Sequence, residues 1–198
     1  MLLVHGWGGT AAQMAPLATY LAAHGLRAVA FEQRGTAAQM VTGLRAMAAA
    51  GPVRAVVAHS FGGTVALAAG IEAPLVLLAS PTGAAAVPRA FARVLGLPPR
   101  AAEEVVARVL PRFGAGFEPV PRPALVVHDP TDAQAPFADG QALASSPGSR
   151  LIVAPGLGHL RVLADETIAA AVLDYIMADD AAPHPGGAGE RASDRKPV

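Results

Sequence analysis

A serine, an aspartate and a histidine each follow a short apolar run of this chain. Ser60 comes after the run that starts at Val53, and Asp132 and His159 come after similar runs further along. A serine hydroxyl is a weak nucleophile until a base takes its proton, and histidine can do this near neutral pH. An acid beside the histidine fixes its tautomer and stabilises the imidazolium. If the fold brings them together, these three residue types predict nucleophilic catalysis.

The residues around Ser60 predict a strand that turns directly into a helix. The apolar run before it is β-branched and short, as in a buried parallel strand. Such a turn presses together the residues two before and two after the serine, so both must be small, and Ala58 and Gly62 are. This pattern is the G-x-S-x-G nucleophile elbow with alanine in the first place. An ordinary strand-to-helix turn whose serine caps the helix explains the pentapeptide equally well.

A glycine-rich turn follows the first predicted strand, Leu2 to Val4, and reads His5-Gly6-Trp7-Gly8-Gly9. Glycines let backbone N–H groups point into a shared cavity, where they can hold a phosphate or an oxyanion. The spacing is neither that of a P-loop nor that of a dinucleotide-binding loop. The oxyanion donors would be the backbone N–H groups of Trp7 and Phe61.

The remaining strands and helices alternate along the chain. Strands are expected at residues 26–31, 75–79, 124–127 and 151–154, and helices at 15–24, 36–50, 61–69, 136–144 and 165–177. Thr36 and Gln39 form a capping-box pattern, and Thr10 to Gln13 fits a small capping turn. The alternation predicts an α/β fold with a doubly wound, mainly parallel sheet of about six strands and helices on both faces. Such sheets carry their sites at the carboxyl ends of the strands.

Two segments depart from this alternation. Residues 81–123 hold eight of the 18 prolines and two helical patterns, which predicts a small helical lid above the sheet. Residues 180–198 lack apolar periodicity, so we expect a disordered tail in which His184 is not a ligand. The predicted organisation is one domain over residues 1–179 with the lid inserted in it.

Composition excludes several classes of function. The 198 residues are 53% hydrophobic and 15% charged with a net charge of zero, so neither nucleic acid nor a membrane surface is an expected partner. The chain has no cysteine, no membrane-length apolar run and no signal peptide, which favours a cytoplasmic location. No cofactor is expected. The histidines at positions 5, 59 and 128 lack metal-ligand spacing. His5 and His59 are expected to brace the glycine-rich turn and the elbow through hydrogen bonds, and His128 is expected to be structural.

Four motifs together resemble the α/β-hydrolase superfamily over nearly all of residues 1–179: HGWGG, AHSFGG, HDPTDAQAPF and GLGH. The resemblance implies that Ser60 is the nucleophile, Asp132 the acid and His159 the base. Asp129 competes for the role of the acid, although at its strand end it could instead cap the loop. Members of the superfamily usually have two more strands before the first motif. This sequence begins inside the strand of the first motif, either because its start is misassigned or because it is a naturally shortened form. Without the two strands, the strand at 26–31 would be an unprotected edge.

The function expected from these observations is a serine hydrolase that cleaves a small ester, or a related acyl compound such as a thioester or lactone. Two alternatives stay open. One is a hydrolase-like receptor or inactive relative that holds a small ligand, and the other is a lyase or acyltransferase of the same fold. The motifs indicate a mechanism, but they identify neither the substrate nor the oligomeric state.

Overall fold

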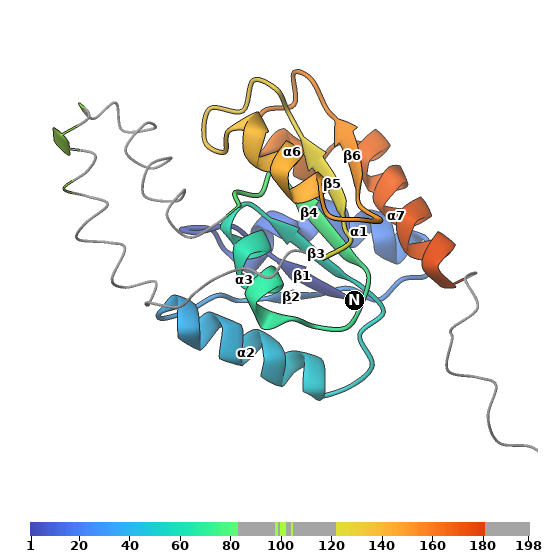
Figure 1. The fold of residues 1–198 in the computed structure, drawn as a ribbon. Coiled ribbons are helices and arrows are strands. Elements are labelled where there is room, and N and C mark those ends of the chain that lie inside the picture. Colours follow the sequence, from blue (N-terminus) through green and yellow to red (C-terminus); the bar gives the residue numbers. More distant parts are fainter. Residues whose placement is uncertain (83–97, 99, 102–103, 105–121, 181–198) are drawn as a thin grey trace, which may run out of the picture.

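A six-stranded, all-parallel sheet forms the centre of the molecule (Figure 1). The computed structural model describes residues 1–82, 98, 100–101, 104 and 122–180. The strands within these residues are β1 (Leu2–Val4), β2 (Val29–Phe31), β3 (Val56–His59), β4 (Leu75–Leu78), β5 (Leu125–His128) and β6 (Arg150–Val153). Their spatial order is β2-β1-β3-β4-β5-β6. Strand β2 lies on one side of β1, and β3, β4, β5 and β6 follow in chain order on the other side. Because all six strands are parallel, their carboxyl ends lie at the same edge of the sheet.

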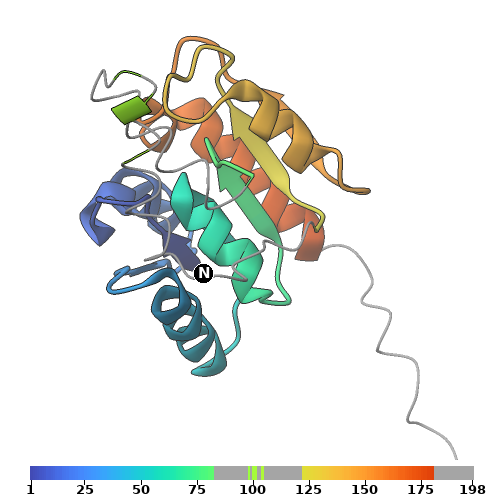
Figure 2. The ribbon, with the colours of Figure 1, turned by 60° about the vertical axis from the view of Figure 1, so that its left-hand side comes forward.

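Helices cover both faces of this sheet (Figures 1 and 2). One face carries α2 (Ala37–Ala49), α3 (Phe61–Ala69) and α6 (Phe137–Ala144). The other carries α1 (Ala15–Ala23) and α7 (Glu166–Asp180). Two short 3₁₀ helices, η1 (Ala11–Met14) and η3 (Arg161–Leu163), precede α1 and α7. This is the doubly wound α/β fold that the alternation of strands and helices predicts.

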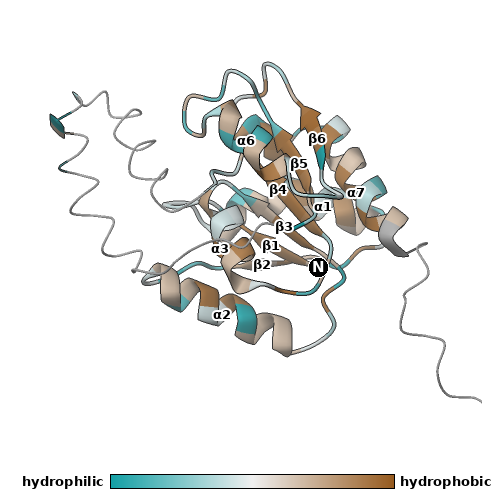
Figure 3. Cartoon of the chain, viewed as in Figure 1, coloured by the Kyte–Doolittle hydropathy of each residue, from teal (hydrophilic) through white to brown (hydrophobic). Residues whose placement is uncertain are grey.

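Alternate residues of each strand enter opposite halves of the core. Leu2 and Val4 of β1 pack with the layer of α2 and α3, whereas Leu3 packs with the layer of α1 and α7. All residues of β3, β4 and β5 are buried, and all are apolar except His59 and His128 at the ends of β3 and β5 (Figure 3). Continuous apolar runs are what a sheet covered on both sides requires.

The helix starts test the capping predictions. The Oγ1 atom of Thr36 accepts the N–H of Gln39 at 3.3 Å, and the Gln39 side chain accepts the N–H of Thr36 at 2.8 Å, so the predicted capping box is confirmed. The predicted turn from Thr10 to Gln13 is present, since the N–H of Gln13 donates to the Thr10 carbonyl at 3.0 Å, but the Thr10 side chain makes no capping hydrogen bond. The N–H of Ala11 instead donates to the Glu32 carboxylate at 3.0 Å, an acceptor supplied by a loop distant in sequence.

Strand β2 forms an edge of the described sheet, as the sequence predicts, but it is shorter than expected. It begins at Val29, because the chain leaves α1 through Gly25 at φ +77° and the N–H of Leu26 still bonds the carbonyl of Leu21. Val29 is 42% exposed, so this edge presents an apolar side chain to solvent.

Most of the predicted lid at 81–123 and nearly all of the predicted tail at 180–198 lie outside the described residues. Within the described part of the chain, none of the helices has the length and apolar character needed to cross a membrane.

Candidate active site

Ser60 lies at the turn between β3 and α3 with an unusual backbone conformation. Its φ is +52° and its ψ is −130°, a region that residues with a side chain rarely adopt. The turn is held because the Ser60 N–H donates to the Leu78 carbonyl, and the Ser60 carbonyl accepts the N–H of Gly63, both at 2.9 Å. The Ser60 side chain makes no hydrogen bond to the first turn of α3, so the interpretation of Ser60 as a helix cap is wrong.

Small residues around the turn are required by close backbone contacts. A Cβ atom on Gly62 would lie 2.4 Å from the carbonyl oxygen of His5 and 2.5 Å from that of Val4, which are backbone atoms at the end of β1. A Cβ atom on Gly6 would lie 3.0 Å from the Cβ of Ser60. The glycine turn after β1 is therefore pressed directly against the Ser60 turn.

A continuous chain of hydrogen bonds joins the three residues singled out from the sequence. The Nε2 atom of His159 lies 2.9 Å from Ser60 Oγ, and its Nδ1 atom lies 2.7 Å from Asp132 Oδ2. The His159 side chain is 8% exposed and that of Asp132 is 0% exposed. Because a carboxylate only accepts, Nδ1 of His159 carries the proton, which leaves Nε2 to accept the hydrogen of the Ser60 hydroxyl.

The second oxygen of Asp132 is bound by the backbone. Its Oδ1 atom accepts the N–H groups of Gln134 at 2.7 Å and Ala135 at 3.0 Å. Burial acts to raise the pKa of Asp132, but the hydrogen bond from His159 and those two backbone N–H groups outweigh it and hold the pKa below its ordinary value. Asp132 is therefore a buried carboxylate that stays charged next to His159.

Asp129 makes different contacts and does not bind the imidazole. One of its oxygens accepts the backbone N–H and the hydroxyl of Thr131, at 2.6 and 2.8 Å, and the other accepts the N–H of Gly158. These hydrogen bonds, led by that of Gly158, hold the pKa of Asp129 below its ordinary value. Asp129 thus fastens the loop that carries His159, in agreement with the alternative role of a loop cap.

His5 braces the glycine turn, as expected. Its Nδ1–H donates to the Gly6 carbonyl at 2.7 Å, and its Nε2 atom accepts the N–H of Gln33 at 3.1 Å. The Gln33 side-chain amide also donates to the His5 carbonyl. Sequence reasoning did not single out Gln33, although its place directly after a predicted strand end is the signal that could have found it.

The positions expected to donate to an oxyanion lie at the two turns. Phe61 is the first residue of α3, where backbone N–H groups and the helix dipole favour negative charge. Trp7 follows Gly6 in the turn after β1, which is closed by the N–H of Gly9 on the Gly6 carbonyl at 3.2 Å. Trp7 is 38% exposed and Leu160, next to His159, is 53% exposed, so apolar side chains border this edge of the sheet.

Two more buried histidines stand beside the three central residues. His59 Nε2 donates to the backbone carbonyl of His159 at 2.8 Å, and burial lowers the pKa of His59 to about 4. His128 Nε2 donates to the carbonyl of Ala135 at 3.0 Å. His128 therefore has a structural role, as expected. His59 was expected to brace the elbow, but its hydrogen bond is to the loop that carries His159, 100 residues away in sequence.

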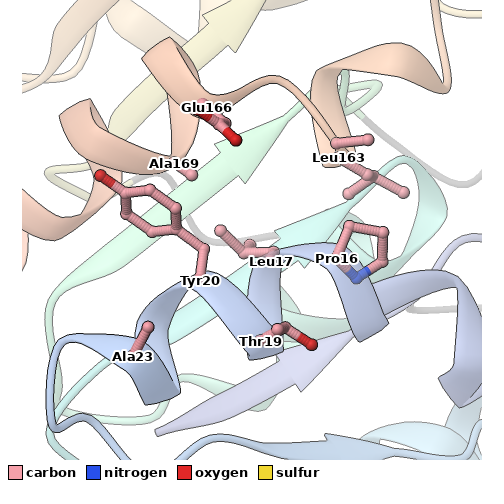
Figure 4. A pocket seen from close by; sticks show the side chains of 9 residues that line it. Pro16, Leu17, Thr19, Tyr20, Ala23, Leu163, Glu166 and Ala169 are labelled. Atoms are coloured by element: carbon pink, nitrogen blue, oxygen red, sulfur yellow. The ribbon is translucent and has the colours of Figure 1, made fainter.

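A separate pocket of about 310 Å³ opens between α1 and the η3–α7 segment (Figure 4). Its wall is largely apolar, with Leu17, Pro16 and Leu163 facing the hollow and Tyr20 and Glu166 supplying polar atoms. None of the three central residues lines it.

Comparison with known proteins identifies the fold. No protein-family profile and no curated protein matches the chain significantly. Solved structures do match. An esterase from Thermogutta terrifontis, solved with malate, is 18% identical over 89% of each chain with a TM-score of 0.63. Est1E from Butyrivibrio proteoclasticus is 19% identical over 91% of this chain and 88% of its own, with a TM-score of 0.65. A meta-cleavage product hydrolase from Pseudomonas fluorescens is 14% identical over 90% of each chain, with a TM-score of 0.68.

These matches define a class of structure, a doubly wound parallel sheet that is also found in hydrolases. The chain has the α/β-hydrolase fold, and its structural neighbours are esterases and other hydrolases of low sequence identity.

Proposed function

We propose that this protein is a serine hydrolase that cleaves a small ester, or a related acyl compound such as a thioester or lactone, through an acyl-enzyme on Ser60. The observation that carries the proposal is the hydrogen-bond chain from Asp132 through His159 to a serine held at positive φ. The fold supports it, since the neighbours include two esterases, one solved with malate and the other also solved with ferulic acid. Both compounds are small carboxylic acids.

The proposed reaction follows from the proton positions. Ser60 Oγ attacks the carbonyl carbon while its proton passes to His159 Nε2, and the tetrahedral oxyanion is stabilised by the N–H groups of Trp7 and Phe61. The protonated His159 then gives its proton to the leaving alcohol or thiol as the acyl bond breaks. Water attacks the acyl-enzyme with His159 again as base, which releases the acid and restores Ser60.

Asp132 assists without changing its own protonation. Its carboxylate keeps the proton of His159 on Nδ1, so that Nε2 faces Ser60, and it stabilises the imidazolium that forms during attack. Its lowered pKa fits this role, because the charge must persist at the pH at which His159 is neutral.

A panel of chromogenic esters of increasing acyl length tests the proposal on wild type and the Ser60→Ala variant. We expect a burst of product from the wild type, and a loss of about 10⁴-fold or more in the variant, which matches serine removal in enzymes of this chemistry. Equal rates in the two proteins would contradict the proposal. Saturable ligand binding without turnover would indicate a receptor instead.

Matched variants of the two aspartates test which is the acid. Asp132→Asn can no longer hold the His159 tautomer, and we expect turnover to fall by about 10³- to 10⁴-fold. Asp129→Asn keeps one oxygen as acceptor for the loop, so we expect a loss of under about tenfold, the scale of one hydrogen bond. The reverse ranking would show that the acid has been assigned to the wrong residue.

A further inference from the structure

We infer that His59 is a positioning residue for His159: its Nε2–H holds the main chain of the histidine loop so that the His159 imidazole can bridge Asp132 and Ser60. The inference rests on the proposed function only for its kinetic consequence. The structural part of it concerns the hydrogen bond itself, and can be tested without any substrate.

The histidine loop needs external anchors because of its composition. It reads Pro155-Gly156-Leu157-Gly158-His159, and both glycines have positive φ, at +81° and +61°. Glycine has little conformational preference of its own, so contacts from outside must fix such a loop.

Three side chains supply those contacts. Asp129 accepts the N–H of Gly158, and Arg161 donates to the Leu157 carbonyl at 3.2 Å from an exposed position. His59 alone of the three bonds the peptide carbonyl of His159, at 2.8 Å, and its own side chain is buried. The residue directly before the proposed nucleophile therefore holds the main-chain carbonyl of the proposed base.

His59 lies beside three of the loops that form the site. It is bonded covalently to Ser60, its Nε2 atom reaches the histidine loop, and its Nδ1 atom would lie 3.2 Å from a Cβ on Gly6 of the glycine turn. The His59 and His159 rings lie 4.9 Å apart between centroids and are tilted by 54°. A shift of His59 would therefore change the distance between His159 Nε2 and Ser60 Oγ directly.

The proton arrangement is defined by the acceptor. A carbonyl oxygen only accepts, so Nε2 of His59 carries a proton. Burial lowers the pKa of His59 to about 4, so near neutral pH the ring is neutral and Nδ1 carries no proton. A charged His59 would lie beside the imidazolium that the proposed reaction forms on His159, and its repulsion would oppose that step. Burial, followed by the nearby His159 and His5, favours the neutral form, whereas the hydrogen bond to the His159 carbonyl and the charge of Asp132 act in the opposite sense.

Three variants distinguish the effect of losing the hydrogen bond from the effect of changing the volume of the side chain. His59→Gln retains an N–H donor at the ε position, whereas His59→Leu keeps bulk and removes the donor. His24→Leu is the matched control, because exposed His24 also donates to a main-chain carbonyl, that of Tyr20 at 2.8 Å, at the end of α1. His59→Asn, whose amide stops at the δ position, replaces the leucine variant if that protein fails to fold.

The kinetic measurement is the rate at which diisopropyl fluorophosphate labels Ser60, followed by the mass of the intact protein as fluoride leaves. We expect His59→Leu to label about 10- to 100-fold more slowly, the loss expected when a reacting group is displaced by about 1 Å. We expect His59→Gln to lose under about fivefold, since the hydrogen bond is re-formed, and His24→Leu to match wild type. Leucine and glutamine variants that label equally fast would overturn the inference.

The second measurement needs no chemistry at Ser60. In the Ser60→Ala background, the Nδ1 proton that His159 shares with Asp132 gives a downfield proton NMR signal. We expect it to persist in His59→Gln and to broaden or vanish in His59→Leu. If wild type is not labelled but the NMR signal behaves in this way, the proposed function is wrong and the positioning role stands. If the signal is unchanged in His59→Leu, the positioning role is wrong.

Discussion

Ser60 combines an exceptional backbone with the side chain that the proposed chemistry needs. A residue with a Cβ at φ +52° and ψ −130° carries strain of about 1 to 3 kcal/mol, which the surrounding hydrogen bonds must offset. This strained residue lies at the carboxyl end of β3, where the turn directs its hydroxyl toward His159. Stability and reactivity therefore compete at this residue.

The cost of this backbone strain in unfolding free energy can be measured with two variants that both lack the hydroxyl. We expect Ser60→Gly to be more stable than Ser60→Ala by about 1 kcal/mol, because relief of strain exceeds the entropy that glycine gains in the unfolded chain. Urea unfolding of the two proteins at one pH gives the difference in free energy. An alanine variant as stable as the glycine variant would show that the turn is not strained.

His59 predicts an unusual dependence of stability on pH. The unfolded state binds a proton with a pKa near 6.5, but the folded state does so only near pH 4. Above pH 6.5, His59 is neutral in both states and does not change the free energy of folding with pH. As the pH falls from there toward 4, only the unfolded state gains the proton. Folding therefore loses up to about 3 kcal/mol, because each tenfold difference in proton affinity between the two states corresponds to about 1.4 kcal/mol.

The comparison is the change in unfolding free energy between pH 7 and pH 5 for wild type and His59→Gln. We expect wild type to lose about 2 kcal/mol more than the variant, which has no group to protonate at this position. Asp132 and Asp129 contribute little to the difference between pH 7 and pH 5. Their ordinary pKa of 3.8 lies below this range, and their pKa values in the folded protein are lower still. Identical losses would mean that His59 titrates normally in the folded protein.

At the scale of elements, the contact between the end of β1 and the start of α3 sets the geometry of the site. The carbonyl oxygens of Val4 and His5 approach Gly62 so closely that no side chain fits there. This contact brings the glycine turn next to Ser60. A larger residue at position 62 would have to separate the two elements.

We expect Gly62→Ala to lower the free energy of unfolding by at least about 3 kcal/mol, because the atoms that the new methyl group meets are backbone and cannot rotate away. Gly51→Ala is the control. Gly51 is exposed, has nothing within 4 Å of its Cβ position and lacks a positive φ, so we expect a small gain of about 0.5 kcal/mol there. Thermal unfolding followed by circular dichroism measures both changes, and a tolerated alanine at 62 would contradict the packing described.

The elements show which features of this molecule are local in sequence and which are not. The capping box of Thr36 and Gln39 is a contact across three residues, and it was predictable. The alternation of apolar runs and helical patterns predicted the parallel sheet and the edge position of β2. The cap of η1 was not predictable, since its acceptor, Glu32, lies 21 residues away from Ala11.

The site shows the same division. The order and spacing of Ser60, Asp132 and His159 identified three residues that the structure joins by hydrogen bonds. The pattern alone could not choose between an elbow and a helix cap, because the difference lies in the backbone torsion of Ser60. The contact of His59 with the His159 carbonyl spans 100 residues and depends on how the loops meet.

At the scale of the whole molecule, the sheet formed by the described residues has two edge strands, β2 and β6, and each exposes a valine, Val29 and Val153. Strand β2 pairs with β1 on one side, and Val29 on it is 42% exposed. An open strand edge with an exposed apolar residue is a template for pairing with another chain. The association of heated or concentrated protein should therefore depend on this strand.

We expect Val29→Lys to reduce turbidity during heating, because a charge on an edge strand opposes intermolecular pairing. Ala46→Lys adds the same charge at an exposed position of α2 and serves as the control. Light scattering at matched fractions of unfolded protein compares the two. An equal reduction in both variants would attribute the effect to net charge rather than to the edge.

The pairing of β4 with β5, which places Val76 beside Leu125, has a consequence for how the molecule could be divided. The serine and the glycine turn lie in residues 1–82, whereas the aspartate and the histidine lie in residues 122–180. A break between these two segments would yield fragments that each lack part of the proposed machinery. If the proposed ester cleavage is measured in the intact protein, its recovery on mixing the fragments would report their reassociation, and the chain could then serve as a split sensor.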